Sequence, residues 1–177
     1  MMRLARLVWL LLLAALFGAA LFFLRPIEPP VPPDSPLHGQ IERIVVEKAA
    51  RRLTVWQDGK VVRNWPIALG FAPEGDKVRQ GDGKTPEGTF RIDRRNDRSA
   101  FHLSLGLDYP QPADRARAKA GGYSPGGDIM IHGQPNSVPE DMKVRGDWTA
   151  GCIALTNAQI RELWQVARLG TVVEVRP

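Results

Sequence analysis

Residues 149–157 read Thr-Ala-Gly-Cys-Ile-Ala-Leu-Thr-Asn and contain Cys152, the only cysteine of the 177-residue chain. The short apolar run 151–155 predicts a strand. Thr156 then offers a helix N-cap, and Gln159 three residues later completes a capping box. This stretch therefore predicts a strand that leads directly into a helix, with the single thiol near the start of the strand.

Residues 37–177, which contain this stretch, are predicted to be one domain made mostly of strands. Residues 171–175 predict a closing strand after the helix, and residues 114–120 predict a second, shorter helix. Asp58-Gly59 is a strong hairpin turn. Further strands are predicted at 41–47, 51–56, 60–69, 89–92, 101–105 and 128–132. The expected fold class is a β-rich α+β domain with one or two helices.

The N-terminal part predicts export. Two arginines precede residues 7–24, which carry no charged side chain. This length is near the lower limit for spanning a bilayer, so residues 1–25 are predicted to be a membrane anchor with the folded part outside. The alternative is a cleaved signal peptide that ends after Ala20. Residues 26–36 contain six prolines and predict an extended linker to the domain at 37–177.

The charge balance says little about a partner. The formal net charge of the whole chain is +5. A mild positive balance suits an anionic polymer or a membrane surface. Nucleic-acid binding needs a concentrated basic stripe, which the sequence lacks, so we expect no nucleic-acid partner.

Chemistry is predicted to centre on Cys152 and His132. A single cysteine in an exported chain has no internal disulfide partner, so it is either a buried inert thiol or kept for chemistry. His132 ends the predicted strand 128–132 and could take the thiol proton, because a free thiol with a pKa near ~8.5 is only a few per cent thiolate at neutral pH. The alternative for His132 is a core histidine.

Three blocks of the sequence carry a resemblance to a known family. They are Gly-Lys-Thr-Pro-Glu-Gly at 83–88, Gly-Gly-Asp-Ile-Met-Ile-His-Gly at 126–133 and Asp-Trp-Thr-Ala-Gly-Cys-Ile-Ala-Leu-Thr-Asn at 147–157. With the 16 residues between His132 and Thr149, they resemble the L,D-transpeptidase catalytic domain family of bacterial cell-wall enzymes, in a Gram-negative branch with a Thr-Ala-Gly-Cys motif. The resemblance implies a β-sandwich or mixed-sheet domain, and with the anchor a periplasmic location at the inner membrane.

The resemblance also implies roles for the residues of the site. Cys152 would be the nucleophile and His132 its base, with the carbonyl of Gly133 orienting the imidazole. Backbone N–H groups of Gly151 and Cys152 would stabilise the oxyanion that forms on attack. Thr149 is expected to support the Cys152 loop or contact substrate.

The predicted substrate contacts are less specific. Tyr109 is expected either to shape the groove wall or to sit in a turn. The commoner family motif has histidine at Ala150 and arginine at Ala154. Arg145 or Lys143, on the preceding loop, is a candidate to replace that arginine.

The implied substrate is the peptidoglycan stem peptide, with a wall-linked lipoprotein as a possible partner. No metal or organic cofactor is expected, because the three histidines lack metal-ligand spacing. The polar residues 134–146 are long enough to be a flap.

Three functions stay open at the level of sequence. The leading one is an L,D-transpeptidase that forms an acyl-enzyme at the third stem-peptide residue and transfers it to an amine. Hydrolysis at the same site, as a carboxypeptidase or a lipoprotein-releasing amidase, shares that intermediate. A non-catalytic wall-binding module is the alternative of another class. A redox function is disfavoured because no Cys-x-x-Cys is present, and a general peptidase would need to cleave ordinary L,L-peptides.

Overall fold

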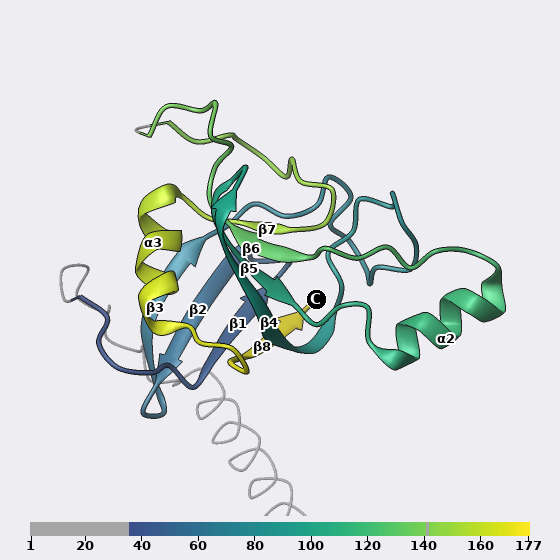
Figure 1. Ribbon diagram of the computed structural model, residues 1–177, viewed down its shortest axis with the longest axis horizontal. Helices are drawn as coiled ribbons and strands as arrows, with labels where there is room; N and C mark the ends of the chain where they lie inside the picture. The colour runs from purple at the N-terminus through teal and green to yellow at the C-terminus, as the bar shows by residue number, and fades with distance from the viewer. Residues whose placement is uncertain (1–35, 141) are drawn as a thin grey trace, which may run out of the picture. The chain divides into compact units, whose positions relative to one another are not determined.

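Eight strands form one curled mixed sheet in the order β3-β2-β1-β8-β4-β5-β6-β7 (Figure 1). The structure is a computed structural model and describes residues 36–140 and 142–177. The strands are β1 (Arg43–Glu47), β2 (Arg52–Gln57), β3 (Lys60–Pro66), β4 (Gly88–Ser99), β5 (His102–Leu107), β6 (Met130–His132), β7 (Ile153–Ala154) and β8 (Val172–Arg176). The described helices are α2 (Pro112–Gly121) and α3 (Asn157–Val166). The β-rich architecture with two helices confirms the fold class expected from the sequence.

The sheet bends at β4. This strand pairs with β8 over Gly88–Arg91 and with β5 from Ile92 onward, and its register shifts between Ile92 and Arg94. A long strand shared between two partners turns the sheet through a corner. The β1–β8 and β6–β7 pairs are parallel, whereas the remaining pairs are antiparallel.

The two ends of the sheet meet at Ala68 and Ala154. Ala68 lies just after β3, and its N–H and C=O exchange hydrogen bonds of 3.0 and 2.8 Å with Ala154 of β7. Gly70 forms a second bridge, with Thr149. The prediction of a strand over 60–69 was therefore too long, because residues 67–70 leave β2 to pair beside the Cys152 turn.

The core lies inside the curled sheet. Alternate residues of the strands supply it, and α3 closes one side by packing against β5. Its largest fully buried side chains are those of Ile44, Leu53, Leu69, Ile92, Leu105, Leu107, Ile131, Ile153, Leu155, Ile160 and Leu163. Helix α3 begins as predicted: Thr156 Oγ1 accepts from Gln159 N at 3.3 Å, and Thr156 N donates to Gln159 Oε1 at 3.0 Å.

The second half of β4 is the clearest departure from the sequence-based prediction. A strand was expected only at 89–92, but β4 continues to Ser99. Residues 93–98 are all polar or charged and face solvent in a hairpin with β5. A strand that buries neither face shows no apolar alternation, so the sequence pattern did not reveal it.

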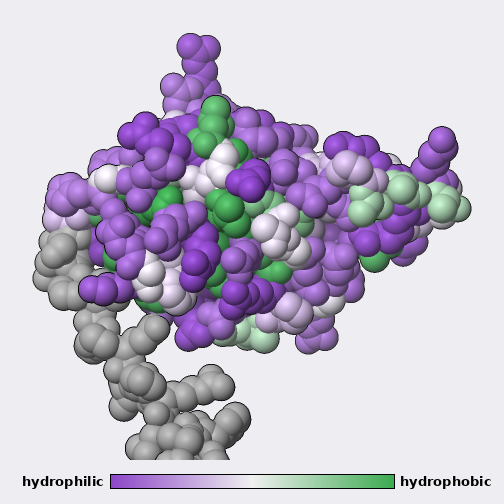
Figure 2. All heavy atoms as spheres, turned by 90° about the horizontal axis from the view of Figure 1, so that it is seen from below, coloured by the Kyte–Doolittle hydropathy of each residue, from purple (hydrophilic) through white to green (hydrophobic). Residues whose placement is uncertain are grey.

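The predictions for the N-terminal part lie outside the described residues. The anchor at 1–25 and nearly all of the linker at 26–36 fall there, and the described residues from 36 onward belong to one compact unit, Val31–Pro177. Within 36–140 and 142–177, no helix has the length and apolar character needed to cross a membrane. Figure 2 shows one face of the molecule as mainly hydrophilic, with hydrophobic residues in small separate groups near its middle.

Candidate active site

The parallel pair β6–β7 brings His132 and Cys152 to one face. Ile131 pairs with Ile153 and His132 pairs with Ala154. Paired residues on neighbouring strands direct their side chains to the same face, and residues two apart share a face. His132, Ala154 and Cys152, two residues before Ala154, therefore face one side, while Ile131 and Ile153 are fully buried on the other.

Cys152 is a partly exposed, protonated thiol. Its Sγ donates to the carbonyl of Asp128 at 3.4 Å. Burial raises the pKa of the Cys152 thiol above its usual 9.0, and the Asp128 charge adds to this; the Met130 backbone and the charges of Lys77 and Arg94 act in the opposite direction. The thiol therefore needs a base before it can react as a thiolate.

His132 is the candidate for that base. It is 3% exposed, and its Nδ1 lies 2.7 Å from the carbonyl oxygen of Gly133. A carbonyl only accepts, so Nδ1 carries the proton and the lone pair of Nε2 is left for another group. Burial lowers the pKa of His132 below 6.5, and the Gly133 carbonyl offsets only part of this shift. The imidazole is therefore neutral at neutral pH and able to accept a proton.

Aromatic rings enclose His132. The Phe101 ring lies 4.5 Å from the imidazole centroid, and the Trp148 ring lies 5.7 Å away in an edge arrangement. These apolar walls supply the burial that keeps His132 neutral. Trp148 Nε1 is, among the described side chains, the one buried nitrogen or oxygen without a hydrogen-bond partner.

Gly133 is held in place by the start of α3. A Cβ at this position would lie 2.6 Å from Asn157 Oδ1 and 3.0 Å from the carbonyl oxygen of Phe101. Asn157 Oδ1 also accepts from Gln134 N at 2.8 Å. Asn157 thus acts as a positioning residue for the carbonyl that orients His132. Sequence analysis assigned it no role, although its place at the start of a helix next to the Cys152 strand was visible.

Thr149 and Gly151 shape the turn that carries the thiol. Thr149 Oγ1 donates to the carbonyl of Cys152 at 2.8 Å and accepts from Gly151 N at 3.0 Å. Gly151 has φ 139°, and a Cβ on it would lie 2.6 Å from the carbonyl oxygen of Lys84. The hydroxyl therefore supports the loop, and the Gly151 N–H is occupied by it. The N–H groups of Gly151 and Cys152 were predicted to hold an oxyanion. Thr149 Oγ1 accepts from the Gly151 N–H but not from the Cys152 N–H.

Buried charged side chains hold the loop at 75–88 against the turn that carries Cys152. Lys48 is 2% exposed, and its Nζ donates to Gly75 O, Thr85 O and Glu87 Oε1 at 2.6–2.9 Å. Lys77 Nζ lies 2.7 Å from Asp82 Oδ1. Burial alone would raise the pKa of Asp82, but Lys77 and three backbone N–H groups lower it to about 2. The block at 83–88 is thus a rigid support for Gly151.

The loop that was predicted as a possible flap is hydrogen-bonded at both of its ends. Gln134 is 4% exposed; its Oε1 accepts from Val144 N at 2.8 Å and its Nε2 donates to Leu155 O at 2.6 Å. At the far end, Asp147 accepts from Leu69 N at 2.9 Å and from Arg51 Nε at 2.8 Å. The described ends of this loop are therefore joined to Leu155, just after β7, and to Leu69, just after β3.

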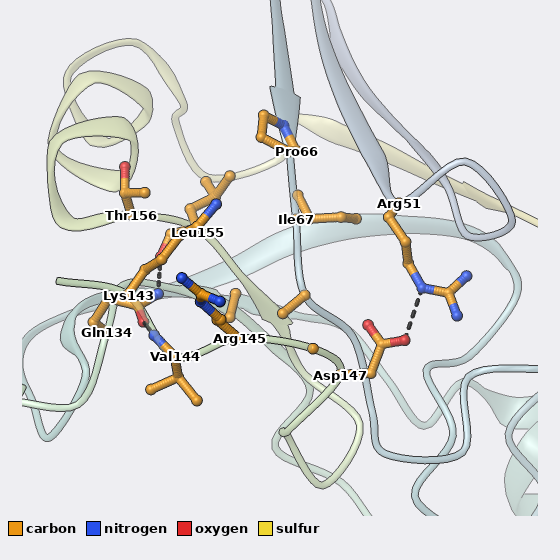
Figure 3. Close-up of a pocket in the computed structure, with 13 residues that line it drawn as sticks. Arg51, Pro66, Ile67, Gln134, Lys143, Val144, Arg145, Asp147, Leu155 and Thr156 are labelled. Atoms are coloured by element: carbon orange, nitrogen blue, oxygen red, sulfur yellow. Dashed lines mark hydrogen bonds and ion pairs between the residues drawn. The ribbon is translucent and has the colours of Figure 1, made fainter.

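A cavity of about 500 Å³ lies under this loop (Figure 3). It is lined by Arg51, Pro66, Ile67, Ala68, Gln134, Lys143, Val144, Arg145, Gly146, Asp147, Ala154, Leu155 and Thr156. Neither Cys152 nor His132 lines it, but Ala154 shares their face of the β6–β7 pair. The cavity therefore reaches β7 at Ala154 but does not include the Cys152 thiol.

The predicted substrate contacts fall in different places. Arg145 lines the cavity together with Lys143. Tyr109 is 4% exposed, and its hydroxyl donates to Pro125 O at 3.0 Å. Burial raises the pKa of Tyr109 well above its ordinary value. The observed contact of Tyr109 is structural, and its contact with substrate stays a prediction. Among the described residues, no three His, Cys, Asp or Glu side chains are grouped as a metal site.

The curled mixed sheet thus carries a thiol on a glycine turn and a neutral imidazole oriented by a backbone carbonyl. Residues 41–175 match the model of the L,D-transpeptidase catalytic domain, also described as YkuD. The chain belongs to this family.

The relatives support the same assignment. Over 93 residues the chain is 33% identical to the "Putative L,D-transpeptidase YafK" of Escherichia coli (strain K12), a match that covers 51% of this chain and 31% of that protein. Two crystal structures of the helical cell shape determining protein Pgp2 from Campylobacter jejuni align with TM-scores of 0.58 and 0.56 at 27% and 26% identity. The alignments cover 77% and 82% of this chain, and 47% and 52% of those chains.

A more distant crystal structure shares the fold alone. It is an L,D-transpeptidase from Xylanimonas cellulosilytica DSM 15894, with a TM-score of 0.50 at 19% identity, covering 82% of this chain and 63% of that one. The chain spans about half or less of the length of YafK and Pgp2.

Proposed function

We propose that this chain is a peptidoglycan L,D-transpeptidase that works through a cysteine acyl-enzyme. The observation that carries the proposal is the orientation of His132. Its Nδ1–H is committed to the Gly133 carbonyl at 2.7 Å, which leaves Nε2 as a base on the face that carries Cys152. Family membership supplies the reaction class.

The proposed reaction proceeds in two steps, acylation of Cys152 and transfer of the acyl group to an amine. His132 Nε2 takes the proton of the Cys152 thiol, and the thiolate attacks the carbonyl of the third residue of a stem peptide. The oxyanion is held by the Cys152 N–H, and its collapse breaks the bond to the following D-residue, whose amine leaves with the proton from His132. An acceptor amine then attacks the thioester and loses a proton to His132, and His132 returns that proton to the departing Cys152 thiolate.

Hydrolysis is the second candidate on the same residues. Water in place of the acceptor amine would give a carboxypeptidase or a lipoprotein-releasing amidase with the same first step. The partly exposed thiol is consistent with either nucleophile. Under both reactions we propose Thr149, Tyr109 and Arg145 as substrate-side residues, a wall-linked lipoprotein as a candidate partner, and a periplasmic domain held at the inner membrane by residues 1–25.

The experiment that tests the proposal compares the 177-residue chain with its Cys152→Ala variant on purified sacculi that carry tetrapeptide stems and lipoprotein remnants. Products are identified by mass spectrometry. New cross-links or exchanged terminal D-residues that are absent with the variant support transpeptidation. Released remnants or shortened stems without new bonds support hydrolysis. Identical products from both proteins would contradict the catalytic proposal and favour a wall-binding module.

A further inference from the structure

The polar partners of the Cys152 sulfur come from the start of β6. Its Sγ donates to the carbonyl of Asp128 at 3.4 Å. A hydrogen bond with the backbone of Met130 acts on the same sulfur and lowers the pKa of the thiol. The place of the sulfur in the resting site therefore depends on where the chain at 128–130 puts these backbone groups.

The backbone at Asp128 has an uncommon conformation. Asp128 has φ 55°, in the left-handed region that side chains rarely adopt, and it follows two glycines, Gly126 and Gly127. Glycines leave the chain before Asp128 with wide conformational freedom. The first hydrogen bond to β5 comes one residue later, where Leu107 N donates to the carbonyl of Ile129 at 2.9 Å. Strand pairing therefore fixes the chain after the carbonyl that accepts from Cys152, and not at it.

Arg94 reaches Asp128 from two strands away. Its Nη2 lies 2.9 Å from Asp128 Oδ1. Arg94 pairs with Gly106 of β5, and Gly106 pairs with Met130 of β6. A Cβ on Gly106 would lie 2.7 Å from Arg94 Nε, so the arginine side chain crosses β5 over this glycine. Met130 and His132 are two residues apart on one strand, so Arg94 lies over the face that carries the catalytic pair.

The Arg94–Asp128 ion pair is placed by packing rather than by burial. The side chains of Arg94 and Asp128 are 38% and 89% exposed, so the pair contributes little to stability. The stem of Arg94 lies on Gly106, and its Nη1 contacts Asp93 Oδ2 at 3.4 Å. Arg94 therefore offers Asp128 a partner whose position is set by β4 and β5.

We propose that Arg94 is a positioning residue for Cys152, because its ion pair with Asp128 fixes the backbone carbonyl that holds the sulfur on the face of His132. The inference rests on the proposed function for the reaction that this position serves. Arg94 makes and breaks no bond. Without it the Asp128 carbonyl can turn away, and a nucleophile that leaves its reactive position reacts more slowly even when substrate binds equally well.

The first test observes the thiol without any substrate. The chain has one cysteine, so the S–H stretching band of its Raman spectrum reports on Cys152 alone, and donation to a carbonyl lowers the frequency of that band. We expect Arg94→Gln to shift the band to higher frequency and Arg94→Lys, which keeps the charge, to shift it less. Asp128→Asn tolerates a positive φ but loses the ion pair, so it should shift the band in the same direction as Arg94→Gln.

The second test separates positioning from binding and folding. With soluble tetrapeptide stems as substrate, Arg94→Gln is expected to lower kcat about three- to tenfold and to leave KM unchanged. Its thermal transition, followed by circular dichroism, should stay in place. Arg98→Gln removes another exposed arginine of β4 and is the matched control, with the S–H band and kcat of the unmodified chain.

The outcomes distinguish this inference from the proposed function. An unchanged S–H band in Arg94→Gln, or an equal shift in Arg98→Gln, would overturn the inference. So would a shifted band with an unchanged kcat. A shifted band in a chain that processes no stem peptide, with or without the substitution, would support the contact to the thiol and contradict the proposed function instead.

Discussion

At the scale of single residues, the candidate site consists of a protonated thiol, Cys152, and a neutral imidazole, His132, that can accept a proton. The surroundings disfavour charge on both groups: burial raises the pKa of Cys152 and lowers that of His132. The resting pair is therefore neutral, and in the proposed reaction a proton would pass from sulfur to nitrogen as the thiol attacks. The Gly133 carbonyl sets the tautomer and so decides which imidazole nitrogen can take the proton.

Alkylation of Cys152 provides a direct test of this resting state. The chain has one cysteine, so iodoacetamide labelling followed by mass spectrometry reports on that thiol alone. Because the pKa of Cys152 is raised from 9.0, the folded protein should react slowly at pH 7, and its rate should still be rising with pH above 9. The denatured chain, with an ordinary thiol, serves as the control. A rate plateau below pH 9 in the folded protein would contradict the neutral pair.

Gly133→Ala is predicted to damage catalysis and stability together. The new methyl group would meet Asn157 Oδ1 at 2.6 Å, so the carbonyl that orients His132 must move. We expect a loss of about 1–3 kcal/mol in the free energy of unfolding, typical of an overpacked site, measured by urea denaturation. Product formation on sacculi should fall by at least about tenfold. Ala150→Gly, at an exposed position of the Cys152 turn, is a control expected to fold and react normally; full activity of Gly133→Ala would contradict the assignment.

At the scale of elements, the loops around the site are held by buried charge and hydrogen bonds rather than by regular pairing. Lys48, Lys77 and Asp82 hold the loop at 83–88 through hydrogen bonds and an ion pair. Gln134 and Asp147 make the hydrogen bonds at the two ends of the loop 134–147. Such contacts join these loops to the sheet through side chains rather than through backbone ladders. They also make the geometry of the site depend on side chains that take no part in the reaction.

Asp82 makes this dependence measurable as a function of pH. Its folded-state pKa of about 2 is lower than its ordinary 3.8, so its contribution to stability is present above pH 4 and is lost as the pH falls towards 2. Asp82→Asn is expected to lower the free energy of unfolding at pH 7 by about 1–2 kcal/mol, a value reduced for the solvent access of the carboxylate. The difference between the two proteins should vanish near pH 2. A constant difference across pH 2–7 would show that charge is not the cause.

At the scale of the whole molecule, the last strand of the chain lies in the middle of the sheet. β8 pairs with β1 on one side and with β4 on the other, and Val173 and Val175 are in the core. β8 thus joins the β3-β2-β1 part of the sheet to the β4-β5-β6-β7 part, and the second part carries His132. Cooperative folding should require β8 (Val172–Arg176).

Truncation tests this arrangement. Deleting residues 172–177 removes β8, exposes both of its neighbours and should abolish the cooperative thermal transition followed by circular dichroism. Deleting only Pro177, which is exposed and outside the strand, should leave the transition in place. A folded protein after the longer deletion would show that the two halves of the sheet are independently stable.

Local sequence signals were sufficient to predict several elements and the family of the domain. The Asp58-Gly59 hairpin has the positive φ values that its residues predict, and the capping box at Thr156 starts α3. The His132 and Cys152 motifs, with their spacing, led to the family that the comparisons confirm. These features depend on neighbours in sequence, so a local pattern is sufficient to reveal them.

Only the tertiary structure decided which distant residues meet. It placed Ala68 against Ala154, Lys84 against Gly151 and Asn157 against Gly133. It also extended β4 through a charged run whose pairing comes from β5. The pairing of the two sheet ends, the buried charges and the cavity all depend on contacts between segments far apart in the chain. Such contacts produce no periodic pattern of apolar residues, so they could not be predicted from the sequence.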